Sequence, residues 1–174
     1  EEDSVGETIK HVCNSEYPKN KLEVIVVSDG STDNTNKIVR DLMKKYKTLK
    51  LLTKDNSGKA DSINCAIKIA KGNLIAVADA DSCPDKKSLA KLTGYFRDPL
   101  MSAVTSFVSV RNKDLNLLTR IQSLEYLIMG WSRKLLDFID SVYVTNGPLS
   151  LYRKKYIVEV GGFDKKSITE DIDI

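Results

Sequence analysis

The sequence predicts an α/β domain built around a central sheet that is mostly parallel and flanked by helices. Short apolar runs typical of buried strands alternate with longer segments in which apolar residues recur every three or four positions, as in amphipathic helices. Such alternation favours a parallel sheet covered by helices in one layered unit. A length of 174 residues suits a single domain with a sizeable core, so we assign residues 1–174 to one domain.

The composition is that of an ordinary globular protein, and it excludes several function classes. The net charge of +3 is too small to indicate nucleic acid as a partner, and no basic block interleaves with aromatic residues. His11 is the only histidine, which argues against a zinc site and against a Ser-His-Asp triad. Three cysteines without a Cys-x-x-Cys pair are interpreted as thiols in a reducing compartment. No apolar run reaches the ~18 residues that a membrane span requires.

The first segment of the chain predicts a helix. Ser4-Val5-Gly6-Glu7 has the form of a capping box, with Ser4 as the N-cap and Glu7 at the third helical position. A chain that opens directly into a helix is unusual in an α/β protein, because a crossover helix normally follows a strand. We therefore expect that a strand precedes Glu1 in the complete protein.

Strands and helices are then predicted in alternation along the chain. They are a strand at 22–27, a helix capped by Ser31 or Thr32 and ending near Lys47, a strand at 49–53, a helix from Lys59 to Gly72, a strand at 74–78, a helix at 86–96, a strand at 103–110, a helix at 115–139, strands at 142–145 and 149–152, and a short helix that closes at Gly161-Gly162. The 115–139 helix is too charged to span a membrane. We interpret it as a core helix, with contact to a membrane surface through Trp131 as the alternative.

The strand at 74–78 ends in the pair of carboxylates Asp79 and Asp81. Its almost unbroken apolar run predicts a strand buried on both faces. Side chains two apart on a strand point the same way, and ligands of open α/β sheets bind at the carboxyl ends of strands. Two carboxylates there suit Mg²⁺ or Mn²⁺. The alternative is an acidic turn in which Asp81 or Ser82 caps the next helix.

Other charged residues are predicted at the same edge of the sheet. Asp29 follows the strand at 22–27, so in a parallel sheet it lies on the edge that carries Asp79. Lys59, at a helix entry, could attract a diphosphate together with the helix N-terminus. The alternatives are an ordinary turn aspartate for Asp29 and a solvated lysine for Lys59. Gly58-Lys59 lacks the upstream glycine of a phosphate loop, and no Gly-x-Gly-x-x-Gly occurs.

Five motifs, in order along the chain, resemble the family 2 inverting glycosyltransferases, above all the processive branch that includes hyaluronan, chitin, poly-N-acetylglucosamine and cellulose synthases. The motifs are VIVVSDGSTDNT, NSGKADSINCAIKIAKG, LIAVADADS, TNGPLSLYR and GGFD…ITEDIDI. The resemblance covers essentially the whole chain. It implies a GT-A nucleotide-diphospho-sugar transferase fold and metal-dependent transfer, with Mg²⁺ or Mn²⁺, from a UDP-sugar (UDP-GlcNAc or UDP-glucose) to a hydroxyl of a growing glycan, giving a β-glycoside.

The resemblance also implies roles for individual residues. Asp29 contacts the nucleotide base, Lys59 is a donor-site lysine, and Asp171 is the catalytic base. Asp81 is the direct metal ligand, and Asp79 lies nearer the nucleotide-sugar and shares the metal. The acceptor end is lined by Asn146, Gly147, Pro148 and Glu170.

The chain also departs from the family pattern at both ends. Only the acidic end of a Pro-x-Tyr-Asn-Glu-like segment is present, at Glu1-Glu2, and no Gln-x-x-Arg-Trp segment or membrane helix follows Asp171. We therefore expect a soluble domain, truncated at both ends, of a membrane-anchored synthase at the cytoplasmic face of the cell membrane. Two alternatives remain: an inactive fragment that self-associates through exposed sheet edges, and a nucleotidyltransferase on a similar fold.

Overall fold

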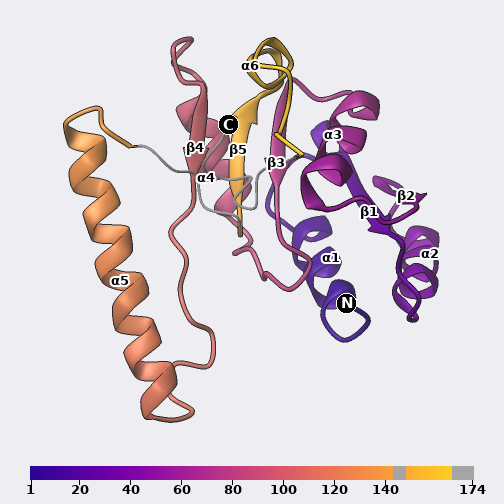
Figure 1. The fold of residues 1–174 in the computed structure, drawn as a ribbon, viewed down its shortest axis with the longest axis horizontal. Coiled ribbons are helices and arrows are strands. Elements are labelled where there is room, and N and C mark those ends of the chain that lie inside the picture. The colour runs from indigo at the N-terminus through magenta and orange to yellow at the C-terminus, as the bar shows by residue number, and fades with distance from the viewer. Residues whose placement is uncertain (143–147, 166–174) are drawn as a thin grey trace.

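A computed structural model describes residues 1–142 and 148–165, which form two small sheets flanked by helices (Figure 1). The strands are β1 (Val24–Asp29), β2 (Leu49–Lys54), β3 (Leu74–Val77), β4 (Ala103–Thr105) and β5 (Ser150–Arg153). The helices are α1 (Val5–Cys13), α2 (Thr35–Lys45), α3 (Lys59–Ile69), α4 (Ser88–Tyr95), α5 (Leu117–Phe138) and α6 (Lys154–Glu159), with a 3₁₀ turn at Lys19–Lys21. The predicted α/β class is confirmed. The strand expected at 142–145 falls almost entirely outside the described residues.

The sheets differ in strand direction. β1 and β2 are parallel, with Val24 opposite Leu49 and Asp29 opposite Lys54. β5 lies between β3 and β4 and is antiparallel to both. In the described part of the chain, no ladder of backbone hydrogen bonds joins β1 to β3.

A cleft of about 1210 Å³ lies between β1 and β3 and is lined by residues of both strands. It leaves the strands less buried than the apolar runs predict: Ile25 and Ile75 are half-buried and Ala76 is exposed. The prediction that β3 is buried on both faces is therefore wrong, because its free edge and part of its surface face the cleft.

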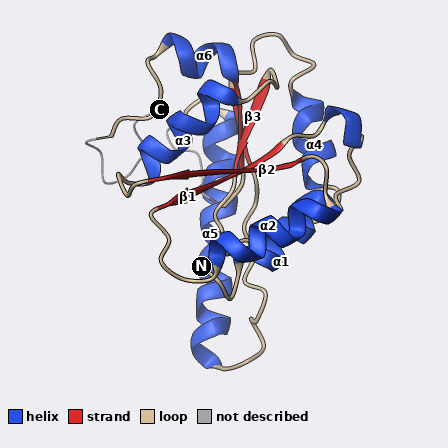
Figure 2. Cartoon of the chain, turned by 90° about the vertical axis from the view of Figure 1, so that its right-hand side faces the viewer, coloured by secondary structure: helices blue, strands red, loops and turns tan. Residues whose placement is uncertain are grey.

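Helices cover both faces of the β1–β2 sheet. Figure 2 shows α1 and α2 on one side of these strands and α3 on the other. The apolar core is divided into three clusters: one between α1, α2 and β2 (Val5, Ile9, Cys13, Val39, Leu49), one around α3, β3, β5 and α6 (Ala60, Ile67, Val77, Tyr152, Ile157, Phe163), and one around α4 (Leu89, Leu92, Phe96, Leu149, Leu151). Full burial of each larger apolar side chain stabilises the fold by ~1.5–3 kcal/mol.

The predicted helix caps differ from those observed. Ser4 is the N-cap of α1, but its hydroxyl lies 2.9 Å from a carboxylate oxygen of Glu1 and caps no helical N–H, so the predicted capping box is wrong. α2 begins only at Thr35, whose N–H donates to Asp33 at 3.0 Å. Ser31 and Thr32 are therefore not its caps. A carboxylate accepts this bond more strongly than a hydroxyl, and the backbone N–H of Glu2 donates to the same carboxylate at 3.2 Å.

α5 stands apart from the rest of the domain (Figure 1), and none of its residues is buried. Trp131 is 68% exposed and Phe138 is 88% exposed. The core interpretation of this helix is wrong for the described structure, because none of its apolar side chains is buried against another element. In residues 1–142 and 148–165, no helix is long and apolar enough to cross a membrane.

Candidate active site

The N-terminus of α3 contacts the ends of both β1 and β3. The carboxylate of Asp29, the last residue of β1, accepts hydrogen bonds from the backbone N–H groups of Ser57 at 2.9 Å and Gly58 at 2.8 Å. The ammonium of Lys59 lies 2.9 Å from the carboxylate of Asp79, two residues beyond β3. Gly58 has φ +93, a conformation that favours glycine. The predicted proximity of Asp29, Lys59 and Asp79 is therefore observed.

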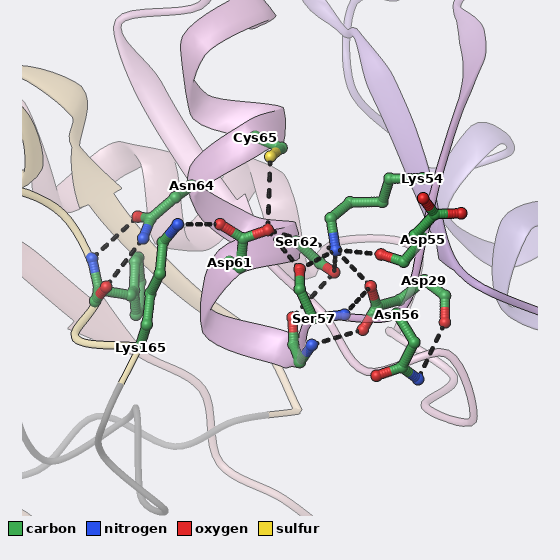
Figure 3. A network of polar contacts seen from close by, with 12 residues as sticks. Asp29, Lys54, Asp55, Asn56, Ser57, Asp61, Ser62, Asn64, Cys65 and Lys165 are labelled. Atoms are coloured by element: carbon green, nitrogen blue, oxygen red, sulfur yellow. Dashed lines mark hydrogen bonds and ion pairs between the residues drawn. The ribbon is translucent and has the colours of Figure 1, made fainter.

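Asp29 is held firmly by its neighbours (Figure 3). Lys54, the residue opposite it in the parallel ladder, forms an ion pair with it, and the Lys54 side chain is 16% exposed. Partial burial alone would raise the pKa of Asp29, but the hydrogen bonds from Lys54, Ser57 and Gly58 outweigh it and lower the pKa below its ordinary value. Asp29 therefore stays ionised and also serves α3 as a capping carboxylate.

The loop that carries Asp79 and Asp81 is tied to α1. The hydroxyl of Thr8 lies 2.8 Å from the carbonyl of Ala80 and 2.7 Å from that of Ser82. The Ser82 hydroxyl lies 2.8 Å from the Asp79 carbonyl, which closes the turn. Asp81 is exposed at the tip of this turn. The loop is thus fixed by its backbone, while the carboxylate of Asp81 faces solvent.

Part of the predicted acceptor end lies beside the same loop. The Ser82 hydroxyl lies 3.2 Å from the carbonyl of Pro148, which is half-buried. The other residues predicted for the acceptor and for the base, Asn146, Gly147, Glu170 and Asp171, lie outside the described residues.

Asp29, Lys59, Asp79 and Asp81 all line the cleft between the two sheets. The two carboxylates Asp79 and Asp81 fit a Mg²⁺ or Mn²⁺ ion, because such ions are commonly held by one or two carboxylates together with substrate phosphates. Elsewhere in the described chain, one group of three potential metal ligands occurs, at Glu7, His11 and Cys83. There Arg111 already bonds Glu7 at 2.7 Å and Cys83 at 3.4 Å.

Several residues of this site were not predicted from the sequence. They are Thr8, which holds the Asp79 loop, and Lys54, which pairs with Asp29. Thr8 could have been found, because it lies on the apolar face of α1, where a buried hydroxyl requires a hydrogen-bond partner. Lys54 meets Asp29 through the register of the parallel β1–β2 ladder, which the sequence alone does not specify.

Comparisons with known proteins agree with this architecture. Residues 1–161 match the model of the family "Glycosyl transferase family 2". The chain is 31% identical to the poly-β-1,6-N-acetyl-D-glucosamine synthases of Staphylococcus aureus and Staphylococcus epidermidis, over 100% of this chain and 42% of theirs.

Solved structures show the same fold. The mannosyltransferase PcManGT from Pyrobaculum calidifontis, in complex with GDP-Man and Mn²⁺, superposes with a TM-score of 0.73 at 25% identity, over 96% of this chain and 45% of that one. S. aureus TarS 1–349 in complex with UDP-GlcNAc superposes with a TM-score of 0.71 at 20% identity, over 98% of this chain and 48% of that one. The fold is that of the GT-A glycosyltransferases, and the chain belongs to glycosyl transferase family 2.

Proposed function

We propose that this domain carries out the metal-dependent, inverting transfer of a sugar from a UDP-sugar to a hydroxyl of a growing glycan, forming a β-glycosidic bond. The observation that best supports the proposal is the meeting of Asp29, Lys59, Asp79 and Asp81 at one cleft, around the N-terminus of α3. The names of the synthase relatives and the UDP-GlcNAc in the TarS structure favour UDP-GlcNAc as the donor, with UDP-glucose as the other candidate. The family match disfavours a nucleotidyltransferase.

In this proposal the donor binds along the carboxyl ends of β1 and β3. Asp29 contacts the nucleotide base, and Lys59 lies beside the diphosphate, where its ammonium favours the anion. Asp79 and Asp81 would hold Mg²⁺ or Mn²⁺. When bound, the ion neutralises the negative charge that develops on the departing diphosphate.

The acceptor approaches from the side of the loop at Pro148, which contacts Ser82. Asn146, Gly147 and Glu170 are proposed to line the acceptor site with Pro148. Asp171 is proposed to take the proton of the acceptor hydroxyl, whose oxygen attacks the anomeric carbon from the face opposite the nucleotide. A single displacement then converts an α-linked donor into a β-glycoside.

The direct test is titration of the domain with UDP and UDP-GlcNAc, with and without Mn²⁺. We expect Mn²⁺ to lower the Kd for UDP. Asp81→Asn should raise the Kd measured with Mn²⁺ by roughly tenfold or more, about 1.4 kcal/mol. Asp85→Asn, in the same region but outside the carboxylate pair, is the control and should bind as the wild type does. Metal-dependent binding that Asp81→Asn leaves unchanged would remove the central assignment. In the longer protein, Asp171→Asn should abolish transfer and leave UDP binding intact.

The unjoined sheets support a second candidate property, self-association of this chain. β1 and β3 both border the cleft, and in the described residues neither has a ladder partner on that side. Free strand edges invite pairing with another chain. Sedimentation over a range of concentrations tests this candidate: a monomer at all concentrations would exclude it.

The placement of the complete protein is also proposed. The chain spans 42% of the length of its synthase relatives, which leaves room for further segments in a protein of that size. We infer that the complete protein is anchored in the cell membrane with this domain at the cytoplasmic face. Fractionation of cells that express the complete gene, with protease protection of this domain as the readout, tests both parts.

A further inference from the structure

The loop that follows β3 is bound to α1 on both sides of Cys83. The hydroxyl of Thr8 lies 2.7 Å from the carbonyl of Ser82, and Nδ1 of His11 lies 3.3 Å from the carbonyl of Pro84. Cys83 lies between these two held residues, and the proline after it restricts its backbone to extended conformations. These contacts determine where the Cys83 thiol lies relative to α1.

Three side chains of metal-binding type meet where this loop contacts α1. Glu7 and His11 are four residues apart on α1 and therefore lie on one face of the helix. A ligand atom of each, together with Sγ of Cys83, lies within 4.8 Å of the other two. The ligands of a tetrahedral zinc ion lie roughly 3.3–3.8 Å apart, given the usual bond lengths. Small side-chain rotations would therefore bring the three atoms onto one ion.

The hydrogen bond of His11 leaves its other nitrogen suited to a metal. A carbonyl oxygen can only accept, so Nδ1 carries the proton in the contact with Pro84. In the neutral imidazole, Nε2 then keeps its lone pair. This atom lies 3.8 Å from Oε1 of Glu7. Histidines that bind metals commonly donate their other N–H to a carbonyl in this way, which fixes the orientation of the ring.

A positive group already lies between two of the three ligands. Nη1 of Arg111 is 2.7 Å from Oε1 of Glu7 and 3.4 Å from Sγ of Cys83. The Arg111 side chain is 70% exposed, and exposed ion pairs contribute little to stability. The cluster therefore accommodates a cation, and Arg111 can turn into solvent when a metal ion takes the place of its guanidinium.

We propose that Glu7, His11 and Cys83 form a Zn²⁺ site that fastens the loop carrying Asp79 and Asp81 to α1. Thiolate and imidazole favour Zn²⁺, whereas paired carboxylates such as Asp79 and Asp81 suit Mg²⁺ or Mn²⁺. The thiol of Cys83 releases its proton to solvent as the zinc–sulfur bond forms, and water takes the fourth position of the ion. The proposal does not rest on the proposed function, because it requires only the contact between α1 and the loop.

The test uses the 174-residue chain, kept reduced by a phosphine, with Co²⁺ as a spectroscopic probe for the zinc site. A thiolate bound to Co²⁺ gives a charge-transfer absorption band in the near ultraviolet, which a site made of carboxylates does not give. We expect this band in the wild type and expect equimolar Zn²⁺ to remove it. Cys83→Ser should abolish the band. His11→Ala should raise the Kd for Co²⁺ by roughly a hundredfold, because even the loss of an outer partner of a metal ligand costs ten- to a hundredfold.

Two matched controls restrict the signal to this cluster. Cys65→Ser removes a thiol that is also partly buried but lies on α3, and it should keep the band. Asp81→Asn should keep it as well, because Asp81 belongs to the other proposed metal site. Its effect on Mn²⁺-dependent UDP binding is a separate measurement, so either proposal can fail while the other stands.

Arg111→Ala gives the sharpest result, because it should change binding in the opposite direction. Without a guanidinium to displace, the ion should bind more tightly, and the Kd for Zn²⁺ should fall below that of the wild type. Zn²⁺ should also raise the Tm of the wild type and not that of Cys83→Ser. Absence of the band in the wild type, or its persistence in Cys83→Ser, would overturn the proposal. Should Cys83→Ser not fold, wild-type affinity for Co²⁺ in His11→Ala would overturn it instead.

Discussion

α3 and α5 belong to the same domain but differ in the contacts that they make with the rest of it. α3 is short and carries few large apolar residues, yet Lys59, Asp61 and Asn64 each bind a different part of the fold. α5 is twice as long, with large apolar residues along its whole length, and none of its residues is buried. The difference shows that regular apolar spacing predicts that a segment is helical, but does not predict which surface the helix packs against. In this domain the helix that organises the site does so through polar side chains.

The largest expected contrast lies between two phenylalanines. Phe163 is 2% exposed and packs beside α3, whereas Phe138, at the end of α5, is 88% exposed. Phe163→Ala should lower the free energy of unfolding by ~3–5 kcal/mol, because it leaves a cavity in the core. Phe138→Ala should change it by less than ~0.5 kcal/mol. Urea denaturation of both variants measures the difference. Equal effects would mean that α5 is as well packed as α3.

Two glycines give the next contrast. Gly162→Ala should cost about 1–3 kcal/mol, because φ is +91 and the new methyl group would meet Asn64. Gly130→Ala, within α5, gains ~0.5–1 kcal/mol of helix propensity. Its new methyl group would meet only the ring of Phe107, a side chain that is 60% exposed and free to turn away. Thermal denaturation should therefore show a lower Tm for Gly162→Ala and an unchanged or higher Tm for Gly130→Ala. A lower Tm for both would contradict the contrast.

The dependence of stability on pH tests the ion pairs that Asp61 of α3 makes. The hydrogen bond from Lys165, followed by that from Ser57, lowers the pKa of Asp61 well below its ordinary value. A carboxylate with a depressed folded pKa stabilises the protein fully above its unfolded value of about 4, and this contribution is lost as the pH falls further. Stability measured from pH 6 to pH 3 should decline less steeply in Asp61→Asn than in the wild type. Asp137→Asn, on α5 and 57% exposed, is the matched control and should retain the wild-type decline. Equal slopes in Asp61→Asn and the wild type would mean that the ion pairs of Asp61 do not stabilise the fold.

The parts of this molecule that the sequence predicts are those determined by local chemistry. The runs at 22–27 and 74–78 become β1 and β3 within a residue or two. Asp29, Lys59 and Asp79 do lie near one another, but they meet at the N-terminus of α3 and not on one edge of a single sheet, because β1 and β3 belong to separate sheets. The contacts of Asp61 with Lys165 and of Asn64 with Phe163 could not be predicted, because they join residues about a hundred positions apart. The burial of α5 was mispredicted for a related reason: amphipathic spacing describes one surface and says nothing about what lies opposite it.

The smallest expected effect belongs to Trp131, an exposed residue of α5. In this 174-residue chain, Trp131→Ala should change the free energy of unfolding by less than ~0.5 kcal/mol, because the side chain is 68% exposed and contributes to no core cluster. Burial of a tryptophan against any partner would raise that cost to ~3–5 kcal/mol. The same substitution in the longer protein therefore reports whether α5 is covered there. A large loss in the longer protein and none in this chain would place the partner of α5 in the additional residues, whereas a large loss in this chain would contradict the exposed position of the helix.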